Sequence, residues 1–370
     1  MFIENIYLLY FRNFERIELN FSGKYNFIIG DNAQGKTNIL EGLYFSAKGK
    51  SFKQNKDREL IHFDHENAYL RTLANTEGIR EKIEVKLSKE KKKIIRINEE
   101  PIDTLKELRT FFDIIVFTPD EFSIIKNGKS YRRDFLDEVI SMISGYRNTL
   151  RNYKRLLEHR NQLMKRSKNS RYFKQQLQAV TVELVKAGSI ILHLRGEYVK
   201  RLEYYAKKFH GILSDEKEIL TVDYDSSVEF QGTVMEIQKD FYHKLSRNLE
   251  RDLYSGFTSV GPHRDDLLID INGHNTKAYA SQGQQRTAVL SLKLAQLKLF
   301  EQTKETSPVI LLDDVFSELD EKRIRFLLGI LSPYQSMITA VNTDFLKDIK
   351  IKEGKIFYIE KGKLKEELCI

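Results

Sequence analysis

Residues 30–37 read Gly-Asp-Asn-Ala-Gln-Gly-Lys-Thr and follow directly on Tyr25–Ile29, which have the composition of a buried strand. The pattern G-x-x-x-x-G-K-T curls the backbone so that successive N–H groups point inward and can hold a polyphosphate. A helix over about residues 35–47 is expected next, and the positive end of its dipole also attracts an anion. The alternative is a glycine-rich turn without a ligand. The strand before the loop and the helix after it favour an α/β fold with a phosphate site.

Each residue type of this loop suits one task in binding a nucleotide. Gly30 and Gly35 allow the tight turn, Lys36 can reach the β- and γ-phosphates, and the Thr37 hydroxyl can ligate Mg²⁺. Lys36 is therefore also a candidate catalytic residue. The residues of the loop that are predicted to bind ATP are Gly30, Asp31, Asn32, Ala33, Gln34, Gly35, Lys36 and Thr37.

A distant strand supplies two carboxylates. Val309–Leu312 are apolar and lead to Asp313 and Asp314, which is typical of a buried strand that delivers a carboxylate to the edge of a sheet. We expect Asp313 to hold Mg²⁺ opposite Thr37, and Asp314 to orient or deprotonate the attacking water. The alternative is that two aspartates only end a strand before a turn. Asp313 lies 277 residues after Lys36, so both ends of the chain would build the site, unlike in compact P-loop kinases and GTPases.

The segment Ser281-Gln282-Gly283-Gln284-Gln285-Arg286 precedes a long predicted helix over about residues 287–302. A serine and a glycine at a helix start can cap the helix and form a second anion-binding end. One interpretation is a capped helix and nothing more. The other is that Ser281 and Gly283 act in trans, as catalytic residues on a γ-phosphate held by another copy of the protein.

Strands dominate the beginning of the chain. Residues 6–11 and 17–21 flank a turn at Arg12-Asn13-Phe14, and residues 66–97 alternate apolar and charged positions, which predicts an antiparallel meander. Further buried strands are predicted at 114–117, 336–341 and 355–359.

Residues 129–211 contain no proline, and their apolar residues recur at helical spacing. Two long antiparallel helices are predicted, roughly 131–165 and 172–210, broken near Ser167-Lys168-Asn169-Ser170. Helices of about 35 residues would each be about 50 Å long. The predicted domains are an ATPase lobe at 1–128, a mainly helical arm at 129–255, and the completion of the ATPase lobe at 256–370.

The net charge of +8 is concentrated in the predicted arm, where residues 147–174 hold ten basic residues and one acidic residue. A stripe of basic residues at i, i+4, i+7 and i+8 would line one helix face and suits the phosphates of DNA. A solvated helix surface is the alternative. Aromatic residues are sparse in this stretch, which contains Tyr153, Tyr172 and Phe173, and this favours duplex contacts over the gripping of single strands. The residues predicted to contact DNA are Arg147, Arg151, Lys154 and Arg155.

The only cysteine is Cys369, which excludes disulfides within the chain and cysteine metal sites. The first residues lack the features of a secretion signal. No uninterrupted apolar run approaches the ~20 residues that span a bilayer. These features predict a cytoplasmic protein that does not enter a membrane.

Together these motifs resemble the RecF family, bacterial recombination mediators related to SMC proteins and to ABC-type ATPases. The resemblance covers residues 7 to about 345, and the ordered combination is far more specific than any one motif. Besides the loop and the Ser281 segment, it is carried by Tyr10-Phe11-Arg12-Asn13-Phe14, Asn38-Ile39-Leu40-Glu41-Gly42, Phe117-Thr118-Pro119, Arg132-Arg133-Asp134-Phe135-Leu136-Asp137, Gly261-Pro262-His263-Arg264-Asp265-Asp266 and Leu312-Asp313-Asp314-Val315-Phe316-Ser317-Glu318-Leu319-Asp320.

The resemblance implies an ABC-type P-loop ATPase head, which is an α/β fold with a mixed sheet, an N-terminal antiparallel meander and an inserted antiparallel helical arm. It implies that Arg12 contributes to the nucleotide site. It also implies a head-to-tail homodimer around two ATP molecules, in which each loop faces the partner's Ser281 and Gly283, with Asp320 at the same interface. DNA with single-stranded gaps or duplex junctions, the proteins RecO and RecR, and help in loading RecA are the implied partners and task.

The sequence departs from the pattern of ABC ATPases at three places. No glutamine occurs between Gln54 and Gln162, where one usually contacts Mg²⁺, so Asp120 or Glu121 would have to substitute. The segment Asn342-Thr343-Asp344 stands where a switch histidine is usual. Asp314 stands where transporters carry glutamate, which predicts turnover well below the ~10 s⁻¹ typical of enzymes.

Three other functions compete with this interpretation. A transporter nucleotide-binding domain would have no use for a basic arm. A defence-type ATPase would need a nuclease domain after Asp313, where 57 residues remain. A DNA clamp that binds ATP without hydrolysing it stays open as an alternative.

Overall fold

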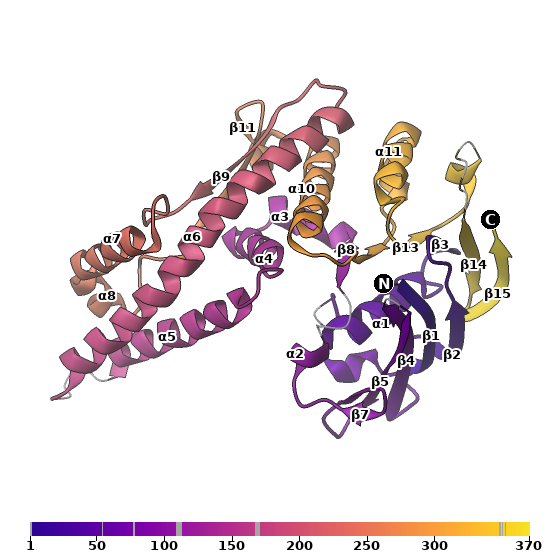
Figure 1. The fold of residues 1–370 in the computed structure, drawn as a ribbon, viewed down its shortest axis with the longest axis horizontal. Helices are drawn as coiled ribbons and strands as arrows, with labels where there is room; N and C mark the ends of the chain where they lie inside the picture. Colours follow the sequence, from indigo (N-terminus) through magenta and orange to yellow (C-terminus); the bar gives the residue numbers. More distant parts are fainter. Residues whose placement is uncertain are drawn as a thin grey trace. The chain divides into compact units, whose positions relative to one another are not determined.

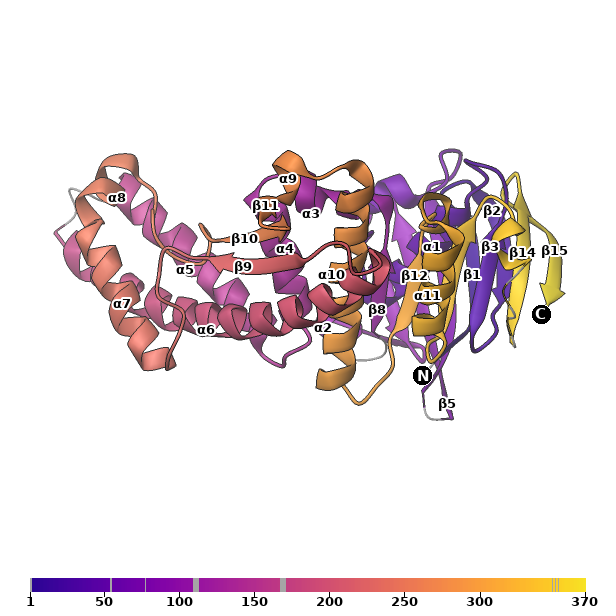
Figure 2. The ribbon, with the colours of Figure 1, turned by 90° about the horizontal axis from the view of Figure 1, so that it is seen from above.

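The glycine-rich loop follows one strand of a six-stranded mixed sheet in the computed structural model, which describes residues 2–370 except 54, 77, 109–112, 167–170, 348, 350 and 352. The strands are β3 (Tyr25–Ile29), β8 (Ile114–Phe117), β12 (Val309–Leu312), β13 (Ser336–Ala340), β14 (Gly354–Glu360) and β15 (Lys363–Cys369). Their order is β15-β14-β3-β13-β12-β8, all parallel except β15 at the outer edge (Figures 1 and 2). The sequence predicted every strand of this sheet except β15.

The second sheet is the predicted antiparallel meander. Its order is β2-β1-β4-β5-β6-β7, and all neighbours pair antiparallel, which confirms the prediction. Buried and exposed residues alternate toward the end of β2, as expected for a sheet with one covered face. The strands are β1 (Phe2–Phe11), β2 (Phe14–Asn20), β4 (Asn67–Thr76), β5 (Ile79–Ser88), β6 (Ile94–Ile97) and β7 (Glu100–Pro101).

Helix α1 (Lys36–Lys48) packs into a core that both sheets share. Leu43 of α1 belongs to one buried cluster with Leu8 and Leu70 of the meander and Leu311 of the mixed sheet. Ten of the thirteen residues of α1 are buried, because the helix is covered on several sides. The start of α1, where the glycine-rich loop ends, is therefore held in place by the core.

The chain folds into two units, Met1–Pro119 with Thr306–Ile370, and Asp120–Glu305. This division differs from the predicted boundaries after residues 128 and 255. Residues 256–305, expected to complete the ATPase lobe, belong to the second unit, because their long helix packs into that unit's core. Besides the two sheets and α1, the first unit contains α2 (Leu105–Leu108), α11 (Glu321–Leu331) and the 3₁₀ turns η1 (Asp57–Leu60), η3 (Phe316–Glu318) and η4 (Asp344–Leu346).

Helices dominate the second unit, together with a small antiparallel sheet of order β11-β10-β9. The helices are α3 (Ser123–Lys126), α4 (Lys129–Ile140), α5 (Tyr146–Arg166), α6 (Phe173–Leu213), α7 (Val234–Arg247), α8 (Leu249–Ser255), α9 (Thr276–Tyr279) and α10 (Gln282–Thr303). The strands are β9 (Leu220–Asp225), β10 (Asp266–Ile271) and β11 (His274–Asn275). Helices α5 to α8 form an elongated arm in which α5 runs beside α6 (Figure 1).

The first predicted arm helix is not continuous. Helix α4 ends at Ile140 and α5 begins at Tyr146, and between them Gly145 has φ 85°, a left-handed conformation that favours glycine. The second predicted helix is confirmed as α6. The predicted break near Ser167-Lys168-Asn169-Ser170 lies outside the described residues.

Helix α6 has 41 residues and is therefore about 60 Å long. By length and composition alone it could cross a membrane, but the core helix of a soluble protein meets the same criteria, and 50% of its most apolar window is buried. Leu184, Ile191 and Leu202 of α6 share a core with Phe241 of α7 and Leu292 of α10. Helix α6 is thus the central packing element of the second unit.

Candidate nucleotide site

Lys36 lies at the start of α1 and folds back onto its own loop. The residue before it, Gly35, has φ 108°, which favours glycine. The Lys36 ammonium donates to the carbonyl of Gly30 and, at 2.9 Å, to the carbonyl of Asp31. Burial lowers the pKa of Lys36, and nearby aspartates oppose that shift. The ammonium therefore lies where phosphate oxygens can replace the carbonyl groups as acceptors.

Thr37 and Asp313, which are far apart in sequence, are in direct contact. The Thr37 hydroxyl donates to Asp313 Oδ1 at 2.7 Å, and the hydroxyl of Thr339 in β13 donates to the same oxygen at 2.9 Å. Burial raises the pKa of Asp313, and these two hydrogen bonds act in the opposite direction. Thr339 was not among the predicted site residues, although a polar residue inside the apolar run of its strand could have indicated it.

The oxygen atoms gathered here fit Mg²⁺. This cation prefers oxygen ligands and is usually bound by one or two protein groups together with substrate phosphates and water. Thr37 and Asp313 offer such a pair, and the buried Oδ1 of Asp314 has no hydrogen-bond partner among the described residues. No cluster of three or more His, Cys, Asp or Glu side chains suited to a metal occurs in the described parts of the chain. A cation here would therefore take its remaining ligands from the phosphates and from water.

Asp314 adopts a backbone conformation that is unusual for a residue with a side chain. Its φ is 50°, a left-handed value that aspartate tolerates better than most residues. Its N–H donates to the Thr339 hydroxyl at 2.8 Å, which fixes the backbone while one carboxylate oxygen stays unsatisfied. Strained conformations and unsatisfied buried groups concentrate at functional sites. This geometry supports the prediction that Asp314 acts on the attacking water.

Two hairpin turns brace the glycine-rich loop, and the sequence analysis identified neither contact. Asn13, in the turn between β1 and β2, donates to the carbonyl of Gln34 at 3.1 Å. The N–H of Lys361, in the turn between β14 and β15, donates to the side-chain carbonyl of Gln34. A Cβ at Gly30 would overlap the carbonyl oxygen of Ile359. Packing from β14, as well as the approach of phosphate, therefore requires glycine at position 30.

Arg12, predicted to bind the cofactor, is held by an ion pair in the first unit. Its guanidinium donates to both carboxylate oxygens of Glu41 at 2.8 Å and to the carbonyl of Glu59 at 2.9 Å. Glu41 is buried in α1. Three of the five N–H donors of the guanidinium are thereby engaged, and a contact of Arg12 with the nucleotide stays a prediction.

The Ser281 segment forms the start of α10, which begins at Gln282 and thus five residues earlier than predicted. The Ser281 hydroxyl accepts from the N–H of Gln284 at 3.3 Å, and the Gln284 side chain accepts from the N–H of Ser281 at 2.8 Å. Ser281 therefore caps α10, as both interpretations expect. Ser281, Gln282 and Gly283 are exposed, and a Cβ at Gly283 would meet nothing within 4 Å. The action of Ser281 and Gly283 in trans stays a prediction that this exposure permits.

The acidic residues considered as substitutes for the missing glutamine lie at the start of the second unit, in the 3₁₀ turn η2 (Pro119–Phe122). Glu121 pairs with Lys293 of α10 at 2.7 Å. Its carboxylate is therefore already engaged by a buried cation, which disfavours it as a ligand of Mg²⁺. Asp120 is exposed.

Three of the four residues predicted to contact DNA are exposed on α5, namely Arg151, Lys154 and Arg155. Arg147 is half-buried and donates to the hydroxyl of Ser141 at 2.6 Å. The predicted basic face of the helix therefore exists at these three positions. Its contact with DNA stays a prediction.

Two other residues of the basic stretch proved to be structural. Arg160 was counted with the basic residues of the arm, but it is buried and donates to Asp252 at 2.9 Å and to the Thr258 hydroxyl at 2.7 Å. Tyr153 is also buried, and its hydroxyl lies 2.7 Å from Nδ1 of His263. Burial lowers the pKa of His263 to about 4. Neither Arg160 nor Tyr153 can reach DNA from these positions.

Comparison with known proteins places this chain in a family. Residues 2–364 match the family model described as RecF/RecN/SMC N terminal domain. Proteins named DNA replication and repair protein RecF from Alkaliphilus oremlandii (strain OhILAs) and Clostridium novyi (strain NT) are 38% and 37% identical to this chain. The two alignments cover 98% of this chain, and 100% and 99% of the respective relatives.

Solved structures agree with the sequence comparisons. A structure described as the recombination mediator protein RecF-ATP in the RecFOR pathway matches with a TM-score of 0.88 and 34% identity, and covers 99% of both chains. The Smc head domain from Pyrococcus furiosus, solved with the C-terminal domain of ScpA, matches with a TM-score of 0.58 and 15% identity over 100% of this chain and 96% of its own. The match to the Smc head domain shows a shared fold alone. The predicted fold class, an ABC-type ATPase head with an inserted helical arm, is thereby confirmed.

Proposed function

The chain belongs to the RecF family, and from this premise we propose that it is an ATP-dependent DNA-binding protein of cytoplasmic DNA replication and repair. In this proposal ATP joins two copies head to tail on DNA, and slow hydrolysis to ADP and phosphate releases them. The observation that carries the proposal is the contact of Thr37 with Asp313. This contact brings together two motifs from opposite ends of the sequence. Their oxygen atoms, Oγ1 of Thr37 and Oδ1 of Asp313, suit a cation bound to a nucleotide.

The residues of the first unit have separate tasks in this reaction. Lys36 and the N–H groups of the loop hold the phosphates, and Lys36 exchanges its present carbonyl acceptors for β- and γ-phosphate oxygens. Thr37 and Asp313 would hold Mg²⁺, which would supply positive charge to neutralise the phosphates. Asp314 uses its unsatisfied buried oxygen to orient the water or accept its proton. The water oxygen then bonds to the γ-phosphorus as the bond to the bridging oxygen of ADP breaks.

The exposed start of α10 supplies the other half of the proposed site. Ser281 and Gly283 are exposed, and backbone N–H groups at the start of a helix attract a phosphate. In the dimer each of these helix starts would face the γ-phosphate held by the partner. ATP would thus stabilise the dimer by binding two surfaces at once.

DNA and partner proteins complete the proposal. The exposed residues Arg151, Lys154 and Arg155 on α5 would contact DNA phosphates, which give affinity that depends on salt and little on sequence. Solved relatives are described as belonging to the RecFOR pathway. We extend that assignment to this chain, with RecO and RecR as partners, gapped or junction DNA as substrate and the loading of RecA as the outcome.

Sedimentation with and without ATP and Mg²⁺ tests the composite site. The wild-type mass should double with ATP, and gapped DNA should strengthen that change. Ser281→Arg places a large cation at the exposed helix start but leaves the loop at 30–37 intact, so it should still bind ATP and stay monomeric. An unchanged wild-type mass with ATP would show that the composite-site mechanism is wrong.

A second variant separates the proposal from a clamp that does not hydrolyse ATP. Asp314→Asn keeps the size of the side chain but removes the base. If hydrolysis normally opens the dimer, this variant should bind ATP and stay dimeric after free ATP is removed, while the wild type dissociates. Equal lifetimes of the two dimers would favour the non-hydrolysing clamp.

A further inference from the structure

We propose that the free end of the arm binds unpaired bases of single-stranded DNA by stacking. The site is the arm-tip cluster, which we define as Tyr172, Tyr254 and Phe257 with Lys165 and Arg171. This inference rests on the proposed function in one respect only, namely that DNA is the ligand. It assigns a base-stacking role to a surface for which the sequence predicted phosphate contacts alone.

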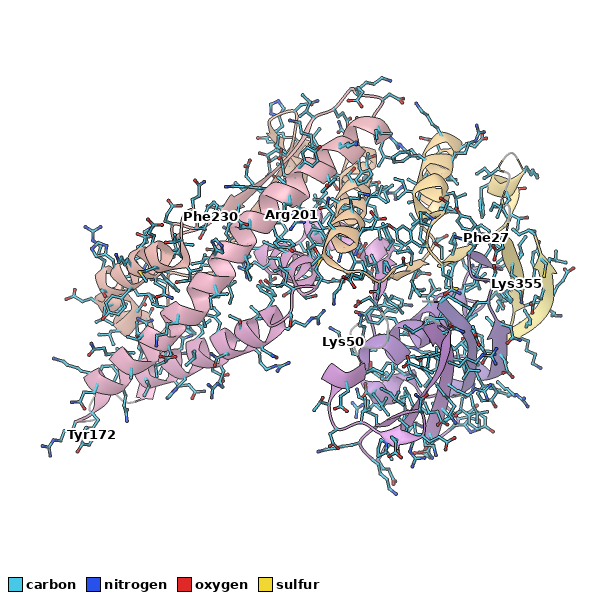
Figure 3. All side chains as sticks on the ribbon, in the orientation of Figure 1. Phe27, Lys50, Tyr172, Arg201, Phe230 and Lys355 are labelled. Atoms are coloured by element: carbon cyan, nitrogen blue, oxygen red, sulfur yellow. The ribbon has the colours of Figure 1, made fainter. Side chains whose placement is uncertain are left out.

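The members of the arm-tip cluster come from separate segments that one small core holds together. Met164 of α5 and Phe173 of α6 lie in the same buried cluster, and Leu253 of α8 packs against it. Each is the immediate neighbour of a cluster residue, Lys165, Tyr172 and Tyr254 respectively. Figure 3 shows Tyr172 at the extreme end of the arm. Packing under the surface therefore brings the three aromatic residues to one end of the unit.

Hydrogen bonds fix the loop that presents Phe257. The side-chain oxygen of Asn161, on α5, accepts from both the N–H and the hydroxyl of Thr258 at 2.8 Å. Gly256, with φ 73°, lies so close to the Lys165 side chain that a Cβ there would approach its Cγ to 2.8 Å. The loop is thus fastened to α5 on both sides of Phe257. An aromatic ring on a fixed loop loses little conformational freedom when a base stacks on it.

The aromatic rings of the cluster are exposed to solvent. The exposed fractions are 94% for Tyr254, 56% for Tyr172 and 48% for Phe257. Large aromatic side chains are strong contributors to binding and are costly to leave in water, so several at one place mark a binding surface. Every base offers a flat face to such rings, which makes the contact tolerant of sequence.

Positive charge lies beside two of these rings, Phe257 and Tyr172. The Lys165 ammonium lies 3.6 Å from the centre of the Phe257 ring, and the Arg171 guanidinium lies 5.9 Å from the centre of the Tyr172 ring. Lys174 and Arg251 are exposed on the adjacent helices, with Glu250 as an exposed acidic neighbour. Alternating cations and aromatic rings match a single strand, whose phosphates and bases alternate in the same way.

This chemistry favours a single strand over duplex DNA. Bases in a duplex are already stacked on one another, and reaching one requires paying the energy to unstack it. The sequence favoured duplex contacts because aromatic residues are sparse in the basic stretch. Tyr153 and Phe173 of that stretch are buried in the structure, but Tyr254 and Phe257, from about 90 residues further along the chain, join the exposed Tyr172.

Affinity for three probes tests the proposal: a thymidine oligonucleotide, an abasic oligonucleotide of the same length and a duplex. Tyr254→Ala should weaken thymidine binding by about 5- to 100-fold, the effect of losing one stacked base. Binding of the abasic probe and of the duplex should stay nearly unchanged, because phosphate contacts are kept. Tyr254→Phe should restore thymidine binding, since the ring remains.

Tyr204→Ala is the matched control, because Tyr204 is also exposed on the arm but lies about 45 Å along α6 from the tip. This control should bind all three probes like the wild type. The proposal is overturned if Tyr254→Ala leaves the affinity for the thymidine oligonucleotide unchanged, a result that would favour the docking of a protein at this surface. It is also overturned if the variant lowers the affinity for all three probes equally. Dimerisation by ATP is measured separately, so failure of the composite site would leave this test readable.

Discussion

Removal of the Arg160 guanidinium should destabilise the arm far more than loss of a surface charge would. Arg160 on α5 donates to Asp252 of α8, to the Thr258 hydroxyl and, at 3.2 Å, to the Thr181 hydroxyl of α6. The side chains of Arg160 and Asp252 are 1% and 0% exposed. The pair therefore joins three segments of the arm in a region that water does not reach.

The expected magnitude follows from what Arg160→Met would leave behind. The Asp252 carboxylate would stay buried with the N–H of Ser259, at 3.0 Å, as its principal remaining donor. Breaking a buried ion pair in this way costs about 3–5 kcal/mol. For a unit of the size of Asp120–Glu305, each kcal/mol lowers the melting temperature by about 2–4 °C. The second unit should therefore melt roughly 6–20 °C lower.

Thermal unfolding by calorimetry and limited proteolysis across the arm are suitable assays, because they report on the second unit separately. Asp252→Asn provides the decisive comparison. In the Arg160→Met protein it removes the stranded charge, so the double variant should be more stable than Arg160→Met alone. This rescue distinguishes a buried charge from a simple loss of packing.

The size of the stability loss and the rescue together decide the interpretation. A loss below about 1 kcal/mol, typical of an exposed pair, or no rescue by Asp252→Asn would refute the assignment of a dry, buried ion pair.

Three further predictions concern ligands. Gly30→Ala should abolish ATP binding, measured by titration calorimetry, because the added Cβ overlaps the backbone of β14. The Cβ of Gly283→Ala meets nothing within 4 Å, so this variant should bind ATP normally and impair only the dimer, which sedimentation measures. Burial raises the pKa of Asp313, so the affinity for Mg²⁺ and ATP should rise as the pH rises through this raised pKa. Binding should release protons, which calorimetry in two buffers of different ionisation enthalpy detects, and binding that does not depend on pH would contradict the prediction. Arg151→Gln and Arg155→Gln should each reduce the slope of log K against log salt concentration for duplex binding by about one phosphate contact. An unchanged slope would show that the duplex binds to another surface.

The parts of the site that could be predicted are formed by residues that follow one another in the sequence. The loop at 30–37 and the strand before Asp313 carry their own geometry, because a short buried strand must deliver the residue that follows it to the edge of the sheet. The structure accordingly brings Thr37 and Asp313 into contact at 2.7 Å. The cap at Ser281 follows the same logic, although α10 begins five residues earlier than its apolar pattern indicated.

The parts that escaped prediction depend on contacts between distant segments. Lys361 reaches Gln34 only because β14 pairs with β3 in a particular register, and neither residue type indicates that meeting. The number of basic residues available on the surface of the arm was overestimated for a related reason. A count of basic residues cannot tell Arg160, buried against a carboxylate 92 residues away, from Arg151, which faces solvent.

The long separation between Lys36 and Asp313 has a topological cause. Strands β8 and β12 are neighbours in the mixed sheet and pair from Ile114↔Val309 to Phe117↔Leu312, yet the whole second unit, Asp120–Glu305, is inserted between them. Closing a long insertion costs little more than closing a short one, because the entropy cost grows only with the logarithm of length. The N–H of Asp313 still bonds to the carbonyl of Phe117 at 2.9 Å, as it would with a shorter crossover between these parallel strands. The insertion thus places Asp313, the expected metal ligand, one hydrogen bond from the strand that leads into the second unit, and the sheet that positions Asp313 is unaltered.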